Sequence, residues 1–436
     1  MSDAALHFLR PGTLQLGAMP PLAIYIHLPW CIRKCPYCDF NSHEWSGGAG
    51  SVAREQTVSL PRSGLAGGGS AANVQAGSTK AALPEAMYLD ALCADLEASL
   101  PLLWGRRVSS IFIGGGTPSL FAPAGIDRLL GDIRARVTLE PGAEITLEAN
   151  PGTFERERFK AYRGAGVTRL SIGVQSFNDA ALQRIGRVHD AAQALAAVAE
   201  ARGSFDTFNI DLMYALPGQT LDELAADLDQ ALACKPPHLS IYHLTVEPNT
   251  MFALHPPALP DDDLASDMLD LIVERTAGVD LQRYEVSAFA QPGHRCRHNL
   301  NYWQFGDYLG LGAGAHGKLS FPHRVLRQVR WREPAAYMKN ALAGNALSNQ
   351  HEVARRDLPF EYMLGALRLR EGFDLQRFAE RTGLPMSSVA PGLQEALQRG
   401  LIEQDEAAGK VWPSARGFDF LSDLQSIFLP KGASAG

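Results

Sequence analysis

The chain has 436 residues, enough for one large domain with a smaller one attached, and its 46% hydrophobic and 20% charged content is ordinary for a globular protein. A formal net charge of −7 argues against a general affinity for nucleic acid or anionic lipid. The sequence holds no apolar run of about 18 residues, and residues 1–22 lack the basic-then-apolar order of a secretory signal. We therefore expect no stable membrane insertion and a cytoplasmic location.

Six apolar, strand-like runs follow one another along the first 250 residues. Each is rich in β-branched or aromatic residues and almost continuously apolar, as parallel strands buried on both faces tend to be. The runs are 23–28, 109–115, 144–150, 169–176, 208–216 and 239–246. Amphipathic helices are predicted between them, as at 85–100 and 221–234, where leucines recur on one face. This alternation predicts an α/β fold, either a parallel β/α barrel or a doubly wound sheet.

The pattern divides the chain into regions of different character. After the N-terminal segment 1–22, a core is expected over 23–250 and an extension of it over 251–350. Within the core, residues 44–84 are rich in Gly, Ser and Ala without periodicity, which predicts a disordered insertion. Residues 351–430 combine short helical patterns with a hairpin. They predict a small α+β domain similar to a winged helix, with a docking or lid role favoured over DNA binding.

Three of the six cysteines fall within eight residues, directly after the first predicted strand. Cys31, Cys35 and Cys38 are too close together for a disulfide framework, and a tight triplet in a cytosolic chain is typical of metal ligation. Three thiolates on one loop would hold a [4Fe–4S] cluster with one iron left open, suited to the amino and carboxylate groups of S-adenosylmethionine (SAM). The alternative is a zinc site with His27 or His43 as the fourth ligand.

Glycine or polar residues lie at the carboxyl end of each later strand, which is the functional end of β/α barrels. The second strand runs into Gly114–Pro118, where missing side chains let the backbone approach a ligand. The following strands end near or carry Glu148, Gln175, Asp211 and Thr245. Each signal is weak alone, but their convergence predicts a binding site at this end.

On these motifs the sequence resembles the radical SAM superfamily, and more narrowly the oxygen-independent coproporphyrinogen III oxidase group and the heme chaperones related to it. The matching segments are YIHLPWCIRKCPYCDFNS (25–42), GGGTPS (114–119), EANP (148–151), SIGVQSF (171–177), IGRVH (185–189) and DLMYALPGQT (211–220). The resemblance covers essentially the whole chain apart from 44–84.

The resemblance implies a partial (β/α)6 TIM-type barrel with SAM across its open face and a C-terminal winged-helix-like domain. Two tyrosines would flank the cluster and the adenine, Tyr25 and Tyr37. The residues that would meet the methionine moiety are Gly115, Gly116 and Thr117. Hydrogen bonds or charge for SAM would come from Glu148, Gln175, Arg187 and Asp211.

Two features separate the oxidases from the chaperones. The oxidase motif continues to a fourth cysteine where this chain has Phe40, and the oxidases have a longer N-terminal arm than the 22 residues found here. Both departures count against decarboxylation of coproporphyrinogen III.

One segment favours the chaperones directly. Residues 298–303, His-Asn-Leu-Asn-Tyr-Trp, match the HNxxYW motif of the chaperones. His298 would be an axial ligand of heme iron, and Tyr302 would offer a flat face to the macrocycle. Arg295 and Arg297 could pair with propionates, and Cys296 is an alternative thiolate ligand. A packed, hydrogen-bonded histidine is the other interpretation.

Two functions therefore stay open. The first is a heme chaperone that transfers heme to acceptor proteins such as respiratory enzymes, as a monomer or a homodimer. The second is a SAM-dependent coproporphyrinogen III oxidase. The sequence does not decide whether the chain is an enzyme.

Overall fold

The structure is a computed structural model that describes residues 12, 14–45, 83–152, 156 and 158–430. The predicted insertion at 44–84 therefore lies, apart from its first and last two residues, outside the described part of the chain.

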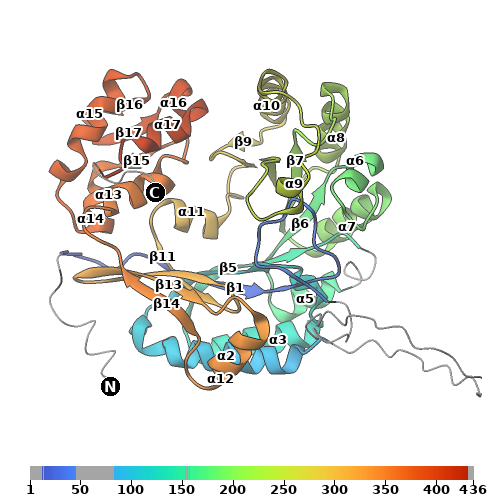
Figure 1. The fold of residues 1–436 in the computed structure, drawn as a ribbon, viewed down its shortest axis with the longest axis horizontal. Helices are drawn as coiled ribbons and strands as arrows, with labels where there is room; N and C mark the ends of the chain where they lie inside the picture. The colour runs from blue at the N-terminus through green and yellow to red at the C-terminus, as the bar shows by residue number, and fades with distance from the viewer. Residues whose placement is uncertain (1–11, 13, 46–82, 153–155, 157, 431–436) are drawn as a thin grey trace, which may run out of the picture.

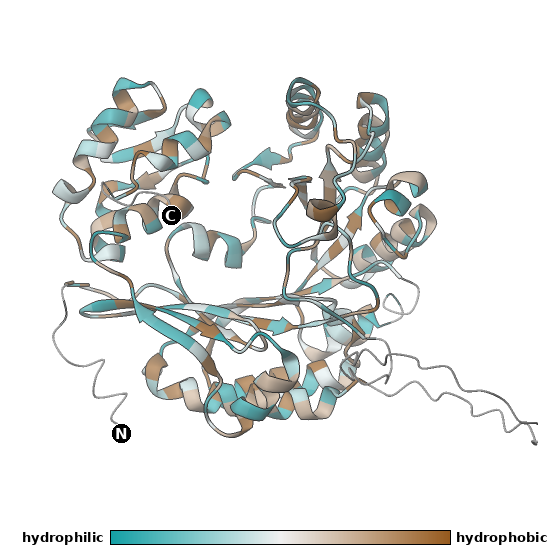
Figure 2. Cartoon of the chain, in the orientation of Figure 1, coloured by the Kyte–Doolittle hydropathy of each residue, from teal (hydrophilic) through white to brown (hydrophobic). Residues whose placement is uncertain are grey.

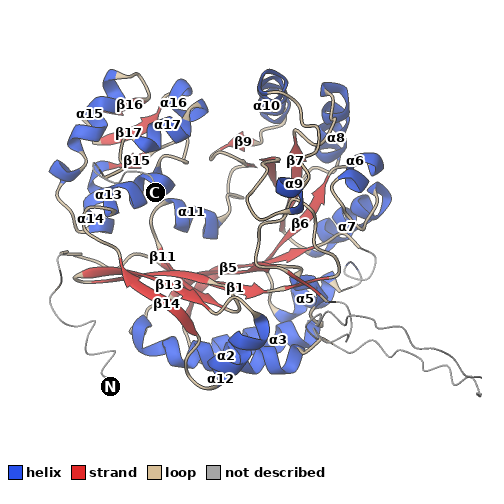
Figure 3. Cartoon of the chain, in the orientation of Figure 1, coloured by secondary structure: helices blue, strands red, loops and turns tan. Residues whose placement is uncertain are grey.

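Six parallel strands form the centre of the molecule, and all six were predicted. They are β1 (Leu22–Leu28), β4 (Val108–Gly115), β5 (Leu139–Ala149), β6 (Arg169–Gln175), β7 (Thr207–Tyr214) and β8 (His238–His243). Each pairs with the next in chain order, without the reversal that defines a doubly wound sheet. The sheet is strongly curved (Figures 1 and 3), so the fold is a partial (β/α)6 barrel.

Helices cover the outer face of this sheet. The main ones are α2 (Glu85–Leu103), α3 (Pro123–Arg134), α5 (Phe159–Ala165), α7 (Ala191–Ser204), α8 (Leu221–Ala233) and α10 (Asp262–Ala277), with shorter α6 (Asp179–Arg184) and α9 (Met251–Leu254). Alternation along a strand sends successive side chains to opposite faces. On β1, Ile24 and Ile26 are completely buried in the core under the helices, whereas Tyr25 and His27 face the inside of the barrel. In Figure 2 the strands carry both hydrophobic and hydrophilic stretches, as expected of a sheet that is covered by helices on its outer face and carries polar residues on its inner face.

Residues beyond the sixth strand extend the sheet at both edges. Next to β1 lies β11 (Asp307–Leu311), followed by the antiparallel strands β12 (His316–Phe321), β13 (Arg324–Arg330) and β14 (Leu347–Glu352). Next to β8 lie β10 (Ala288–Ala290) and β9 (Gln282–Arg283). Helix α12 (Pro334–Leu342) contacts α2 on the outer face, while α11 (Arg297–Trp303) lies on the inner side (Figure 1). The added strands leave the barrel open and give its inner face a wide floor.

The C-terminal domain has its own hydrophobic core and stands on the inner side of the sheet. It contains α13 (Leu358–Ala366), β15 (Phe373–Asp374), α14 (Leu375–Thr382), α15 (Ala390–Gln398), β16 (Ile402–Asp405), β17 (Lys410–Pro413), α16 (Ala415–Asp419) and α17 (Leu421–Ser426). Its three strands form a separate sheet in the order β15-β17-β16. Leu14 and Leu16 of the N-terminal segment pack into the same core. None of the helices in the described residues is long and apolar enough to cross a bilayer.

Candidate cofactor and ligand site

The cysteine loop begins at the short strand β2 (Trp30–Cys31), which pairs with β3 (His43–Glu44) and so closes the loop at its base. All three thiols are half-buried on the wall of a cavity of about 290 Å³, called here the cluster cavity. Burial raises the pKa of Cys31 to about 11 and also raises the pKa of Cys38. In the metal-free chain these groups are therefore thiols, and a bound metal would displace the protons because thiolates are the ligands.

The three thiols of the cysteine loop are not gathered as closely as a single zinc ion would need. Three thiolates bound to one zinc ion at 2.3 Å would lie about 3.8 Å apart. Among the described residues, Glu144, Cys296 and His298 are the donors that gather within 4.8 Å of one another, and the cysteine loop does not form such a group. Neither histidine of the zinc alternative lines the cluster cavity, and the ring of His27 bonds Tyr25 and the carbonyl oxygen of Asn41. The donor set therefore suits a [4Fe–4S] cluster better than a single zinc ion.

The glycine motif after β4 packs its backbone tightly under the cluster loop. Gly115 has a φ of +115°, and a Cβ there would come within 2.6 Å of the His27 ring. A Cβ on Gly116 would lie 2.6 Å from the carbonyl oxygen of Trp30. Thr117 follows, with its hydroxyl 3.5 Å from the Cys31 sulfur. The motif is thus required for packing, and its three residues line the cluster cavity beside the thiols.

Two carboxylates stand in the cluster cavity, Glu148 on β5 and Asp211 on β7, with β6 between these strands. Glu148 accepts a hydrogen bond from the Gly115 amide at 3.1 Å, and Asp211 accepts from Ser171 at 2.9 Å and Asn209 at 2.7 Å. Burial, reinforced by Asp211, raises the pKa of Glu148 to about 8, and burial also raises the pKa of Asp211. A cationic ligand beside them would favour their ionised forms.

Arg187 connects the polar wall of the cluster cavity to the cysteine loop. Its guanidinium donates to Asn150 Oδ1 at 2.6 Å and to the carbonyl oxygen of Gly173 at 2.7 Å, and it lies 3.6 Å from the Cys35 sulfur. Asn150 also donates to Thr117 at 3.0 Å. Sequence reasoning did not select Asn150, although it lies in the EANP segment that was noted.

Of the remaining residues predicted for this cavity, Gln175 and Tyr37 lie on its wall and Tyr25 does not. Gln175 has a φ of +69° at a register shift between β6 and β7. Tyr37 packs against Phe252 with ring centres 6.4 Å apart. Tyr25 does not line the cluster cavity. It stacks on Phe112 in the neighbouring cavity.

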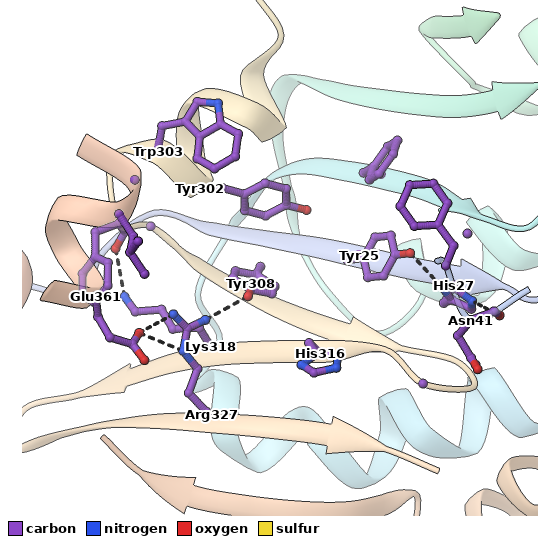
Figure 4. Close-up of a pocket in the computed structure, with 18 of the residues that line it drawn as sticks. Tyr25, His27, Asn41, Tyr302, Trp303, Tyr308, His316, Lys318, Arg327 and Glu361 are labelled. Carbon is purple, nitrogen blue, oxygen red and sulfur yellow. Dashed lines mark hydrogen bonds and ion pairs between the residues drawn. The ribbon is translucent and has the colours of Figure 1, made fainter. Parts of the chain in front are cut away.

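A second and larger cavity, of about 640 Å³, lies on the same inner face of the sheet. It is called here the aromatic cavity, and its ring-bearing walls are Tyr25, His27, Phe40, Phe112, Tyr302, Trp303, Phe305, Tyr308 and His316. Figure 4 shows Tyr25, Tyr302 and Tyr308 around a common space, with His316 on the strand side of it. Phe40, Gly115 and Glu148 line both cavities, so the two adjoin.

Charged groups on the floor of the aromatic cavity are mostly paired. Lys318 is bonded to Asp307 at 2.9 Å. Arg327 is bonded to Tyr308 at 2.9 Å and to Glu361 (Figure 4). These residues come from β11, β12, β13 and α13, in segments without a recognisable motif. Sequence reasoning missed them, and no local signal marks them.

The structure places His298 behind the wall of the aromatic cavity, since it lines neither cavity. Its ring is buried, stacks on Phe112 at 4.2 Å, and bonds Glu144 through Nδ1 at 3.0 Å. Burial lowers the pKa of His298, so the neutral ring donates this hydrogen to Glu144. Its Nε2 lies 3.2 Å from the Cys296 sulfur, which is a thiol because burial raises its pKa.

The other residues predicted for the heme site, in and just before this motif, point in different directions. Tyr302 and Trp303 line the aromatic cavity, as Tyr302 was expected to do for a macrocycle. Arg295 pairs with Glu371 at 2.8 Å, and Arg297 donates to the Gly142 carbonyl oxygen at 2.8 Å. Neither arginine lines the aromatic cavity, so the structure does not bring them together with Tyr302.

The fold and the cysteine loop define a radical SAM protein. The chain matches the model of the radical SAM superfamily over residues 25–231 and that of the HemN C-terminal domain over residues 353–420. Among solved structures, it is similar to coproporphyrinogen III oxidase (HemN) from Escherichia coli, with a TM-score of 0.73, 23% identity and 98% of each chain covered. That likeness shows the fold.

Curated relatives show to which family of radical SAM proteins the chain belongs. The chain is 43% identical to heme chaperone HemW of Haemophilus influenzae over 95% of its length and 99% of the relative. It is 42% identical to heme chaperone HemW of Escherichia coli, with the same coverage of 95% and 99%. The chain belongs to the HemW family. The cofactors of this class are a [4Fe–4S] cluster and SAM, and the residues around the cluster cavity fit both.

Proposed function

We propose that this protein is a heme chaperone that holds heme in the aromatic cavity and passes it to an acceptor protein. The observation that carries the proposal is the shared wall: Phe40, Gly115 and Glu148 belong to both cavities. A ligand in the aromatic cavity would therefore touch residues that also face the cluster and SAM. The names of the relatives supply the identity of the ligand.

The aromatic cavity has the size and chemistry that a porphyrin needs. Its volume of about 640 Å³ lies within the range of small-molecule sites, roughly 300–1,000 Å³. Tyr25, Phe112, Tyr302 and Trp303 provide flat apolar surface, on which a macrocycle gains both burial and stacking.

In this proposal the cluster cavity controls heme binding in the neighbouring aromatic cavity. Cys31, Cys35 and Cys38 hold the cluster. SAM is held by residues that line the same cavity, namely Gly115, Gly116, Thr117, Glu148, Gln175, Arg187 and Asp211. When bound, these cofactors supply one-electron chemistry and a charge beside the shared wall. Because Glu148 lies on that wall, loading of the cluster cavity changes the charge that faces the aromatic cavity.

The alternative function is that of an oxygen-independent coproporphyrinogen III oxidase. Adjoining cavities for SAM and a porphyrin also suit that reaction, but Phe40 stands where the oxidases have a fourth cysteine. We expect no decarboxylated product from coproporphyrinogen III under anaerobic, reducing conditions with an intact cluster. Formation of product would make the oxidase the better description.

The proposal also covers the compartment, the acceptor proteins and the oligomeric state of this chain. Clustered thiols on an accessible loop require a reducing compartment, which favours the cytoplasm. Respiratory heme enzymes are the proposed class of acceptor, and a homodimer is the proposed state in which heme is stored. Light scattering with and without heme and SAM tests the homodimer directly.

A pair of matched substitutions tests the heme site. Leu364 is 41% exposed on the wall of the aromatic cavity, whereas Leu342 is 52% exposed on α12, on the opposite face of the sheet. In anaerobic hemin titrations followed by Soret absorbance, the parent chain and Leu342→Trp should saturate near one heme per chain. Leu364→Trp should weaken binding at least tenfold. Equal binding by the two variants would remove the aromatic cavity from the proposal.

A further inference from the structure

Three histidines lie in or beside the aromatic cavity, and they differ in what their ring nitrogens contact. The ring of His27 bonds the Tyr25 hydroxyl at 2.7 Å and the Asn41 carbonyl oxygen at 2.9 Å. The ring of His298 bonds Glu144 and faces the Cys296 sulfur. Both rings are therefore committed to the protein itself.

His316 is different. It lies at the start of β12, is exposed, lines the aromatic cavity, and its ring has no hydrogen-bond partner among the described residues. Figure 4 shows the His316 ring on the strand side of the cavity, below Tyr308 and Tyr25. An imidazole in this setting has a lone pair free for a ligand, and neutral imidazole is a common axial ligand of heme iron.

The strand pairing aligns His316 with Tyr25 on the sheet that lines the aromatic cavity. Tyr25 on β1 is paired with Gly310 on β11, and a Cβ on Gly310 would lie 2.0 Å from the carbonyl oxygen of His316. Tyr25, Gly310 and His316 thus form a row across three neighbouring strands. A side chain on Gly310 would collide with the His316 backbone, so this glycine allows β11 and β12 to approach closely at His316.

One cation of the cavity wall is suited to a carboxylate. The guanidinium of Arg327 is held by Glu361 and Tyr308, and Lys318 is held by Asp307. Arg332 is exposed on the cavity wall, and its backbone carbonyl, rather than its guanidinium, contacts Asn41. A guanidinium at a cavity mouth can form paired hydrogen bonds with a carboxylate.

We infer that His316 is the axial ligand of the heme iron and that Arg332 binds a heme propionate. This inference rests on the heme-binding function proposed above and assigns its ligands. His298 then acts as a positioning residue, since it fixes α11 and the cavity-facing Tyr302 through Glu144 and Phe112.

The test is a hemin titration of the full-length, cluster-loaded protein under anaerobic conditions, with Soret spectra and electron paramagnetic resonance of the ferric heme. The variants are His316→Ala, His298→Ala and Arg332→Gln. The control is His255→Ala, because His255 is exposed at the end of α9 and lines neither cavity. Iron content and circular dichroism report whether each variant folds and keeps its cluster.

We expect His316→Ala to weaken hemin binding at least tenfold, to shift the Soret maximum and spin state, and to regain the parent spectrum with added imidazole. Arg332→Gln should weaken binding a few-fold without a spectral change, and His255→Ala should match the parent chain. Binding by the parent chain with an unchanged affinity and spectrum in His316→Ala would overturn the assignment and leave the heme function standing. Absence of saturable binding by the parent chain would overturn both.

Discussion

The two adjoining cavities are built from different kinds of sequence. The cluster cavity collects residues from short motifs at the carboxyl ends of consecutive strands, so its parts are close in the fold because the barrel repeats in chain order. The aromatic cavity combines residues of β1, β4 and β5 with residues of β11, α11, β12, β13 and α13. This second group reaches the cavity only because the sheet is extended beyond β1 and the C-terminal domain stands above it. A repeating architecture makes the first cavity predictable, whereas the second depends on the tertiary arrangement.

The largest effect that separates the two cavities is expected from Cys35→Ala. With one thiolate missing, the cluster should not assemble, and iron should fall from about four atoms per chain to a trace. Iron analysis and visible absorbance of anaerobically reconstituted protein measure this. Cys234→Ala, at the end of α8 and outside both cavities, is the matched control and should keep the full iron content. Equal iron in both variants would remove Cys35 from the ligand set.

The second effect concerns the wall behind the aromatic cavity. His298→Ala removes the stack on Phe112 and the hydrogen bond to Glu144, leaving a buried carboxylate with fewer donors. Burial alone would raise the pKa of Glu144, but the bond from His298, with Arg169 and backbone amides, lowers it to about 2. We expect a loss of about 2–4 kcal/mol in the free energy of unfolding. Urea denaturation measures it, and an unchanged midpoint would contradict the structural role.

The third effect is a pH dependence of folding stability that arises from Glu148 on the wall shared by the two cavities. Glu148 has a pKa of about 8 in the fold, above the usual value near 4.5, so between these values the folded state binds more protons than the unfolded state. The stabilising contribution is present in full below about pH 4.5 and is lost as the pH rises to about 8, at most about 1.4 kcal/mol per pH unit.

Glu148→Gln keeps the shape and removes the titration. Denaturation of SAM-free protein at several pH values should show that the parent chain loses more stability than the variant between pH 5 and pH 8. Parallel pH profiles would show that Glu148 does not titrate in this range.

The smallest effect on stability is expected where the cavities meet. Phe40 is 59% exposed, so Phe40→Ala should change the free energy of unfolding by less than about 0.5 kcal/mol. Because Phe40 lines both cavities, the same change should weaken both hemin and SAM binding a few-fold. Calorimetric titration with each ligand checks this, and an effect on neither would show that Phe40 does not couple the two cavities.

Individual residues show which parts of the fold and the site can be predicted from the sequence. The six strands and the cysteine loop follow from apolar runs and spacing, and Glu148 and Asp211 were found because strand ends converge, whereas Arg187 was named only through the family resemblance. Tyr25 was expected at the cluster but lies in the aromatic cavity, since alternation along β1 sets only its face and not its neighbour.

His298 and His316 show most clearly what cannot be predicted from the sequence. The first lies in a visible motif, yet its ring is turned toward Glu144, whose position on β5 is far away in the chain. The second has no motif, and its exposure on the cavity wall follows from the pairing of β11 with β12 and β1. Local sequence patterns do not contain these long-range contacts.

The most direct test of the central claim is a crystal structure of the cluster-loaded protein with hemin, prepared anaerobically. The account predicts heme in the aromatic cavity, with its macrocycle against Tyr25 and Tyr302 and its iron within bonding distance of His316. Heme bound elsewhere on the protein, or an empty aromatic cavity in crystals that contain heme, would contradict it.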